Sequence, residues 1–284
     1  MEIINRRARI ASLTRKLRRE NKTIGFVPTM GALHEGHLSL VEEARQMSDV
    51  VIVSIFVNPT QFNETGDFKR YPRDLTADAE LLTEYQVDYV FAPEEQEIYG
   101  EKFSTFVYVE SLTETLEGAS RPGHFRGVAT VVTILFNIIR PDYAFFGQKD
   151  AQQVAVIKRL TQDLGFDTEI IVGQTIREES GLAMSSRNAL LSLEERQKAS
   201  IIYQALRKAK IAAKEGERGA ARLTEIVREK IASEPLAQIE YIAVVDAETL
   251  EPIEKIAENA VLIAVAARFG NTRLIDNTII NRKQ

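Results

Sequence analysis

Residues 28–37 read Pro28-Thr29-Met30-Gly31-Ala32-Leu33-His34-Glu35-Gly36-His37, and they follow the short apolar run Ile24-Gly25-Phe26-Val27. A strand that ends in a glycine-containing turn and then opens a helix presents free backbone N–H groups and a positive dipole end to an anion. His34 and His37 are three residues apart, so on a helical first turn they share a face and can point at one phosphate chain. The stretch therefore predicts a nucleotide-binding turn.

Working outward from this turn, apolar β-branched runs alternate with helical patterns over the first two thirds of the chain, which predicts an α/β fold with a Rossmann-like parallel sheet. The expected strands are Ile24–Val27, Val50–Val57, Asp88–Phe91, Tyr143–Phe146 and Glu169–Val172, with Phe103–Val109 as a further candidate. The expected helices are Leu38–Met47, Leu75–Tyr85, Val128–Ile139 and Ala151–Leu164.

The pattern changes after about residue 175. Helical stretches at 193–214 and 220–232 precede strand-like runs at 239–245 and 261–267, which predicts a smaller α+β domain. We therefore expect a Rossmann-like nucleotide-binding domain over residues 1–175 and a smaller α+β C-terminal domain over residues 176–284.

Composition excludes several classes of protein. The chain has no cysteine, which excludes disulfides, thiolate zinc sites and enzyme-bound thioesters. Its net charge of −5 disfavours a broad nucleic-acid surface. No apolar run is long enough for a membrane span or a signal peptide, so we expect a cytoplasmic protein that binds no membrane and no nucleic acid.

The unusual polar residues collect where predicted strands end, which is where parallel sheets bind ligands. Beyond the histidine turn, these clusters are Asn58-Pro59-Thr60-Gln61, Gly147-Gln148-Lys149-Asp150, and Thr175-Ile176-Arg177-Glu178, which leads to Met184-Ser185-Ser186-Arg187. Each alone is compatible with an ordinary turn, a capped helix start or a polar loop. One such cluster after each of four strands favours a ligand site.

The His-x-Gly-His spacing resembles the signature of class I aminoacyl-tRNA synthetases and nucleotidyltransferases, and residues 184–187 resemble the second signature of that superfamily. Taken together, six segments resemble the pantoate–β-alanine ligase family: Pro28–His37, Phe56–Phe62, Tyr71–Arg73, Arg121–Val128, Phe145–Gln153 and Met184–Asn188. The resemblance implies an AMP-forming acid–amine ligase that condenses pantoate with β-alanine through a pantoyl adenylate, with ATP as a substrate and Mg²⁺ as the metal.

The resemblance also implies roles for individual residues. His37, His34 and Lys149 would be catalytic, with Asp150 assisting the metal. The expected ATP-binding residues are Met30, Gly31, Ala32, Leu33, His34, Glu35, Gly36, His37, Gly147, Gln148, Lys149, Asp150, Ile176, Met184, Ser185, Ser186 and Arg187. Pantoate would be bound by Gln61, Gln153 and Met30, and β-alanine by Gln61, Asn58 and Tyr71. His124 and Arg121 would lie near the pyrophosphate or give structural support.

The family further implies a homodimer formed through the N-terminal domain and a C-terminal domain that closes over the active site. Two alternatives stay open from the sequence. One is a nucleotidyltransferase with a different acceptor, although the amide pair Gln61 and Gln153 suits a non-phosphorylated substrate better. The other is a non-catalytic nucleotide- or RNA-binding module.

Overall fold

The computed structural model describes residues 1–63 and 65–281, and these residues group into two compact units. The first unit comprises Met1–Gly147 and Val156–Gly173, and the second comprises Gln148–Ala155 and Gln174–Gln284. The turn that follows Gly147 thus groups with the C-terminal residues, although it lies within the first predicted domain.

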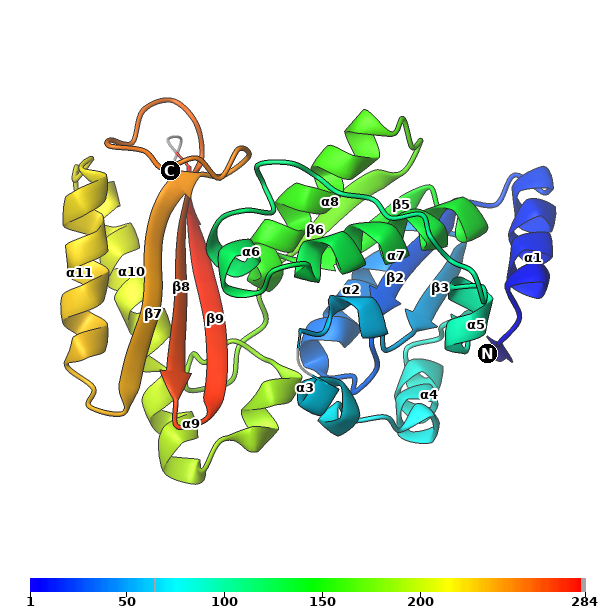
Figure 1. Ribbon diagram of the computed structural model, residues 1–284, viewed down its shortest axis with the longest axis horizontal. Coiled ribbons are helices and arrows are strands. Elements are labelled where there is room, and N and C mark those ends of the chain that lie inside the picture. Colours follow the sequence, from blue (N-terminus) through cyan, green and yellow to red (C-terminus); the bar gives the residue numbers. More distant parts are fainter. Residues whose placement is uncertain (64, 282–284) are drawn as a thin grey trace. The chain divides into compact units, whose positions relative to one another are not determined.

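The first unit contains a six-stranded, fully parallel sheet, drawn from blue to green in Figure 1. Its strands in spatial order are β1 (Glu2–Ile4), β4 (Tyr89–Phe91), β3 (Val50–Ile55), β2 (Ile24–Thr29), β5 (Tyr143–Gly147) and β6 (Glu169–Gly173). The five strands predicted from apolar runs are confirmed, and the α/β fold class with them. From β2 the chain first adds strands on one side of the sheet, through β3 and β4, and then adds β5 and β6 on the other side. The point between β2 and β5 is therefore a topological switch point, and open α/β sheets bind their ligands at such points.

The helices of this unit are α1 (Arg7–Arg19), α2 (Glu35–Met47), α3 (Thr65–Arg70), α4 (Leu75–Glu84), α5 (Glu95–Ile98), α6 (Leu116–Ser120) and α7 (His124–Ile139), with the 3₁₀ turn η1 at Pro59–Gln61. The predicted helices are confirmed as α2, α4 and α7, of which α2 and α7 begin three and four residues earlier than predicted. The other helices of this unit are not predicted from the sequence. Helix α8 (Ala151–Asp163) has its first five residues in the second unit and the remainder in the first.

Alternation along β2 explains how both faces of the sheet are covered. Phe26 packs edge-on against Phe136 of α7, with ring centroids 6.4 Å apart, while its neighbour Val27 joins the core formed with α2 residues such as Leu38 and Val41. Both strand residues are fully buried. A strand covered on both faces is held in one register, which fixes where the turn after Thr29 begins.

The prediction of a strand at Phe103–Val109 is wrong. Its residues pair with no strand in the described part of the chain, and its aromatic and β-branched side chains serve packing instead. The Arg126 guanidinium lies 3.6 Å from the Phe106 ring centroid, and the Val107 N–H donates to Thr130 Oγ1 of α7. The β-propensity of this segment thus reflects contact with a helix.

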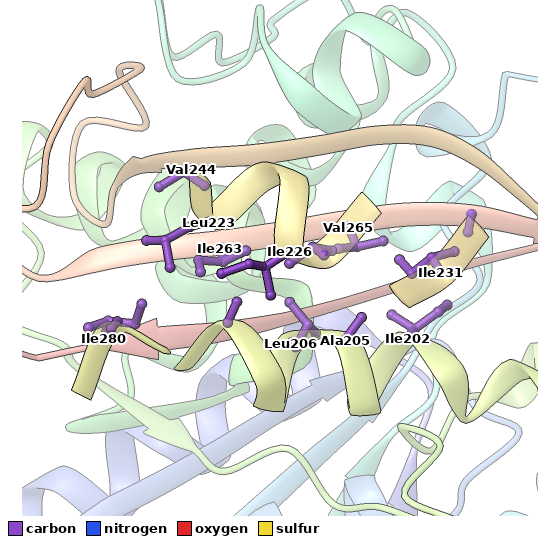
Figure 2. Close-up of a cluster of buried hydrophobic side chains, with 14 of the residues drawn as sticks. Ile202, Ala205, Leu206, Leu223, Ile226, Ile231, Val244, Ile263, Val265 and Ile280 are labelled. Carbon is purple, nitrogen blue, oxygen red and sulfur yellow. The ribbon is translucent and has the colours of Figure 1, made fainter. Parts of the chain in front are cut away.

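The second unit carries a three-stranded antiparallel sheet of β7 (Ala237–Asp246), β8 (Val261–Phe269) and β9 (Thr272–Ile280), drawn from orange to red in Figure 1. Its helices include α9 (Leu193–Ala199), α10 (Ile201–Lys214) and α11 (Ala220–Ala232), and its 3₁₀ turns are η2 (Gln148–Asp150) and η3 (Ser186–Leu190). Figure 2 shows apolar side chains of both long helices, Leu206 and Ile226 among them, packed with Ile263 and Val265 of β8.

Two predictions for this unit need correction. The helix expected over residues 193–214 is two helices, because the Ser200 hydroxyl donates to the carbonyl of Gln197 and interrupts the run. The sequence pattern does not predict strand β9, because polar residues stand in its middle. Among the described residues, no helix is long and apolar enough to cross a membrane.

Candidate functional site

His34 and His37 stand together at the start of α2, directly after the turn that follows β2. His34 is the N-cap of the helix, and its Nδ1 accepts from the Gly36 N–H at 3.1 Å. The backbone N–H of His34 donates to His37 Nδ1 at 3.4 Å. The ring centroids lie 4.2 Å apart. The structure therefore brings the two predicted catalytic histidines into contact.

These hydrogen bonds select a tautomer for both rings. Because each Nδ1 accepts a hydrogen bond from a backbone N–H, it carries no proton of its own, and a neutral imidazole then has its proton on Nε2. Both rings are half-buried. The pair consequently consists of two Nε2–H donors on one helix start, a chemistry that suits phosphate oxygens.

The backbone N–H groups of the preceding turn are not free, contrary to the prediction. Gly31 donates to Thr29 Oγ1 at 3.2 Å, and Ala32 and Leu33 donate to the Asp78 carboxylate at 3.0 and 2.8 Å. An anion that occupies successive backbone N–H groups fills the nest that a phosphate would take. The imidazoles, rather than the turn's backbone, are therefore the groups suited to a phosphate here.

Gln61 and Asn58 lie in a buried hydrogen-bonded chain after β3. Asn58, 1% exposed, donates from Nδ2 to Gln61 Oε1 at 3.0 Å, and Gln61 Nε2 lies 3.0 Å from the Met30 sulfur. Tyr99 Oη donates to Asn58 Oδ1 at 2.7 Å. This chain sets which end of each amide is oxygen and which is nitrogen. Met30, Asn58 and Gln61, three residues expected to bind the two small substrates, are thus brought together.

Close backbone approach holds this segment against α7. A Cβ at Gly127 would stand 2.5 Å from the carbonyl oxygen of Thr60 and 2.7 Å from the Gln61 nitrogen, so no side chain fits there. The Gly127 carbonyl in turn accepts from Asn58 Nδ2 at 3.2 Å. The glycine is therefore required by the path of residues 58–61.

His124 and Arg121 support the backbone of Gln61. His124 Nδ1 lies 2.8 Å from the Gln61 carbonyl oxygen, and an Arg121 guanidinium nitrogen lies 3.2 Å from His124 Nε2. Since a guanidinium can only donate, Nε2 accepts and Nδ1–H donates to the carbonyl. This arrangement favours the structural alternative for both residues. Tyr71, predicted to bind β-alanine, packs edge-on against Phe62 at 5.7 Å.

In the second unit, the turn with Lys149 is held by Asn277 of β9. Asn277 Nδ2 donates to the carbonyl oxygens of Gln148 and Lys149 at 3.0 and 2.9 Å, and its Oδ1 accepts from Gln148 Nε2 at 3.1 Å. Lys149 Nζ lies 3.7 Å from Asp150 Oδ1. Gln153 follows in the first turn of α8 and is half-buried.

The segment Met184–Arg187, predicted to bind ATP together with Ile176, contacts that residue through Met184. The Met184 N–H donates to the Ile176 carbonyl at 3.0 Å, and Ser185 caps η3 by accepting from the Arg187 N–H at 3.3 Å. Neighbouring Arg177 forms two hydrogen bonds to buried Asp276, at 2.6 and 2.9 Å. This network anchors the loop to β9.

Three supporting residues escaped the sequence analysis: Asp78, Tyr99 and Asn277. Each acts through a contact with a residue 41 to 129 positions away in the chain. No local motif marks them, because an aspartate in a helix or an asparagine in a strand has no distinctive spacing.

Comparison with known proteins gives one consistent result. The family model for pantoate–β-alanine ligase matches residues 2–279. Pantothenate synthetases from Syntrophotalea carbinolica and Moorella thermoacetica are 52% and 53% identical over 280 residues, which is 99% of this chain and 99% of each relative.

Solved structures agree with these matches. A pantothenate synthetase from Thermus thermophilus is 45% identical with a TM-score of 0.90, over 98% of this chain and 99% of that one. A pantoate–β-alanine ligase from Francisella tularensis, complexed with β-γ ATP and β-alanine, is 38% identical with a TM-score of 0.81, over 98% and 97% of the two chains.

Proposed function

The chain belongs to the pantoate–β-alanine ligase family, and from that premise we propose which of its residues carry out each step of the reaction. It is an ATP-dependent ligase that forms the C–N bond of pantothenate from pantoate and β-alanine. The observation that carries this assignment is 52% identity over 99% of the chain to a pantothenate synthetase. Similarity along the whole chain also favours the ligase over a different nucleotidyltransferase or a non-catalytic module.

In the proposed first step, a carboxylate oxygen of pantoate attacks the α-phosphorus of ATP. The new O–P bond gives pantoyl adenylate, and the bond to the β-phosphate breaks to release pyrophosphate. Negative charge spreads over the phosphoryl oxygens as this happens, and preorganised donors stabilise it. The two Nε2–H groups of His34 and His37 are suited to this role, with His37 as the donor to the departing group.

In the second step, the amine of β-alanine attacks the acyl carbon of the adenylate. The C–N bond forms, AMP leaves with the pair of electrons, and the amine loses a proton. Neither step needs a protein nucleophile, in agreement with a chain that has no cysteine. Holding the two reactants in line supplies most of the catalysis.

Gln61 is proposed to fix pantoate, and its neighbours explain why it can. Its Oε1 and Nε2 are both bonded within the chain Asn58–Gln61–Met30, and an amide oxygen and nitrogen can each make a second bond. A neutral amide binds hydroxyl and carboxylate oxygens without competing as a nucleophile. Gln153 is proposed to bind pantoate in the same way, and Asn58 and Tyr71 to serve the β-alanine side.

Lys149 is proposed to bind phosphate, because its side chain is only 19% exposed and its backbone is held by Asn277. Ser185, Ser186 and Arg187 supply hydroxyl and guanidinium donors of the kind that bind a triphosphate. Ile176, bonded to Met184, would lie against the adenosine together with Gly147.

The Lys149 turn offers Mg²⁺ one carboxylate, that of Asp150. Among the described residues, no group of three or more acidic, histidine or cysteine side chains could hold a metal ion. Asp150, with its side chain 48% exposed, is the acidic side chain beside Lys149. Such a set suits Mg²⁺ bound chiefly through the phosphates of a substrate with one protein carboxylate. The ion supplies neutralising charge on the outer phosphates when bound.

We also propose that the protein forms a homodimer and is located in the cytoplasm. Light scattering over the working range of protein concentration tests the first, and a monomer at every concentration would refute it. Cell fractionation tests the second.

The experiment that tests the proposed function measures pyrophosphate release from ATP and Mg²⁺ with pantoate, with and without β-alanine. Pantothenate is followed by mass. AMP and pantothenate formed together, in a reaction that requires both substrates, is the expected result. Absence of any pantoate-dependent reaction would contradict the assignment.

A further inference from the structure

Asp78 is a buried carboxylate that binds the backbone of the histidine turn. It lies on α4, is 4% exposed, and belongs to a helix more than forty residues beyond the turn in the chain. Its two oxygens are used separately: Oδ1 accepts from the Leu33 N–H at 2.8 Å and Oδ2 from the Ala32 N–H at 3.0 Å. Such paired acceptance determines the direction of both N–H bonds.

The turn that Asp78 binds has an unfavourable backbone. Gly31 has a φ of +79° and Ala32 a φ of +51°, so two successive residues are left-handed and one of them carries a side chain. An alanine adopts this conformation only when its surroundings hold it there. Asp78 is also close enough to require glycine at residue 31, where a Cβ would stand 2.8 Å from Oδ2.

The path of this turn determines where the histidines begin. His34 follows Leu33 directly, and its own N–H donates to His37 Nδ1. A rotation of the Leu33–His34 peptide would therefore turn away the donor that holds the second ring. Asp78 thus fixes the two peptide groups whose N–H groups it accepts, those of Ala32 and Leu33. These two groups determine where the next peptide group, that of His34, points, and with it the placement of both imidazoles.

We propose that Asp78 is a positioning residue for the adenylation step, acting on ATP only through the backbone that places His34 and His37. The inference rests on the proposed role of the two histidines. It adds a residue outside the motif to the machinery of the first half-reaction. It also gives a chemical reason for the left-handed alanine, since one carboxylate draws both N–H groups to the same side of the turn.

Electrostatics agree with this geometry. Burial raises the pKa of Asp78 and the nearby Asp74 charge raises it further, while the N–H groups of Leu33 and Ala32 act in the opposite direction. A buried carboxylate that the fold retains despite the cost of desolvation is typical of functional sites.

The test is Asp78→Asn, which keeps the size of the side chain but replaces one acceptor by an NH₂ group facing a backbone N–H. We expect pantoate-dependent pyrophosphate exchange to fall about a hundredfold in kcat, because small misplacements of catalytic groups have effects of this order. The KM for β-alanine should stay within about twofold, since that substrate enters after adenylation. A kcat within about threefold of wild type would overturn the proposal.

A control separates positioning from loss of stability. Asp74 is exposed and caps the same helix by accepting from the Ala77 N–H at 3.0 Å. Asp74→Ala should lower the thermal midpoint of unfolding while leaving kcat within about twofold. If it lowered kcat as much as Asp78→Asn does, Asp78 would be a stabilising residue of α4 only, and the proposal would be wrong.

The double variant Asp78→Asn/His37→Ala tests whether Asp78 acts through the histidines. Residues that act as a unit give losses that do not add, so the double variant should lose less than the product of the two single losses, because only His34 is left to misplace. Multiplied losses would overturn the proposal. A normal rate in His37→Ala would instead refute the proposed function of the histidines, so the two failures are distinct. Should Asp78→Asn not fold, Asp78→Glu carries the test, and an unchanged kcat there overturns the proposal.

Discussion

The side chain of Asn277 holds the backbone of Lys149, with Nδ2 of the asparagine 2.9 Å from the lysine carbonyl oxygen. The same nitrogen also donates to the Gln148 carbonyl, and the asparagine oxygen accepts from the Gln148 side chain. Both ends of the amide are therefore satisfied by one turn. A strand remote in the chain thus determines the conformation around the predicted phosphate-binding lysine.

Changing Asn277 to Asp should reverse this attraction. A carboxylate in place of the NH₂ group would face two carbonyl oxygens and repel them, so the Lys149 turn should shift. We expect the rate of pantoate-dependent pyrophosphate exchange to fall by about tenfold to a hundredfold. Asn137→Asp, which adds the same charge at an exposed position of α7, is the matched control and should keep the wild-type rate. Equal rates in the two variants would contradict the proposal that Asn277 holds the Lys149 turn in its active conformation.

His37→Ala and Lys149→Ala should each remove most of the first half-reaction and leave the fold intact. Loss of one preorganised donor to developing charge lowers the rate by about a hundredfold or more. Formation of pantoyl adenylate by purified, folded enzyme is the measurement. Lys158→Ala, on an exposed face of α8, is the control for loss of a lysine. A variant that forms the adenylate at the normal rate would show that its residue has no part in the step.

Tyr99→Phe should weaken pantoate binding through Gln61. Without the hydroxyl, Asn58 Oδ1 loses its 2.7 Å donor and keeps only its bonds from Thr60, so the Asn58 amide holds the Gln61 amide less firmly. We expect the KM for pantoate to rise about threefold to tenfold and the KM for ATP to stay unchanged. Tyr108→Phe, at an exposed position, should change neither. Equal changes in the KM values for pantoate and ATP would contradict the proposal that Tyr99 acts on pantoate through Asn58 and Gln61.

The ionisation of Tyr99 provides an independent check on its burial. Burial raises the pKa of Tyr99 to about 12, with the hydrogen bonds that the tyrosine hydroxyl forms with Thr60 and Asn58 acting against it. Absorbance of the phenolate should therefore show one tyrosine that ionises last, and this step should be missing from Tyr99→Phe.

Asp246 should make stability depend on acid pH. Burial alone would raise its pKa, but hydrogen bonds from Thr249, Asn259 and Glu248 outweigh burial and lower the pKa below the ordinary value of 3.8. Since the folded pKa lies below the unfolded one, the stabilisation is present above about pH 4 and is lost as the pH falls through the folded pKa.

Asp246→Asn should accordingly reduce the free energy of unfolding by about 1–2 kcal/mol at pH 7, and the difference should narrow below about pH 4. Urea unfolding of both proteins across this range is the measurement. Asp163→Asn, a change at a largely exposed side chain, should show little effect at any pH. A difference that stays constant down to about pH 3 would mean that ionisation of Asp246 contributes nothing.

Elements with strong local signals could be predicted from the sequence, and elements held by distant partners could not. The apolar run that forms β3 predicts a strand because both of its faces are covered. Strand β9 has Asp276 and Asn277 in its middle, a pattern typical of a loop. Those two side chains are buried because Arg177 and the Lys149 turn satisfy them, which no local pattern reveals.

The same distinction holds for the candidate site. The histidines, Gln61 and Lys149 can be predicted to lie after strand ends, where parallel sheets collect ligand-binding residues, and their roles stay predictions. Asp78 and Tyr99 cannot, because each bonds to a neighbour of those residues, Leu33 and Asn58, that lies more than forty positions away in the chain. The prediction of free N–H groups at the glycine turn is wrong for this reason, since Asp78 already occupies two of them.

The hydrogen bond from Asn277 to Lys149 has a consequence for the synthesis of the protein on the ribosome. Asn277 is synthesised 128 residues after the lysine that it holds. A growing polypeptide can therefore carry every predicted catalytic residue and still have the lysine turn unsupported. If Lys149 has its proposed role, a prematurely terminated product that lacks β9 should therefore use little ATP.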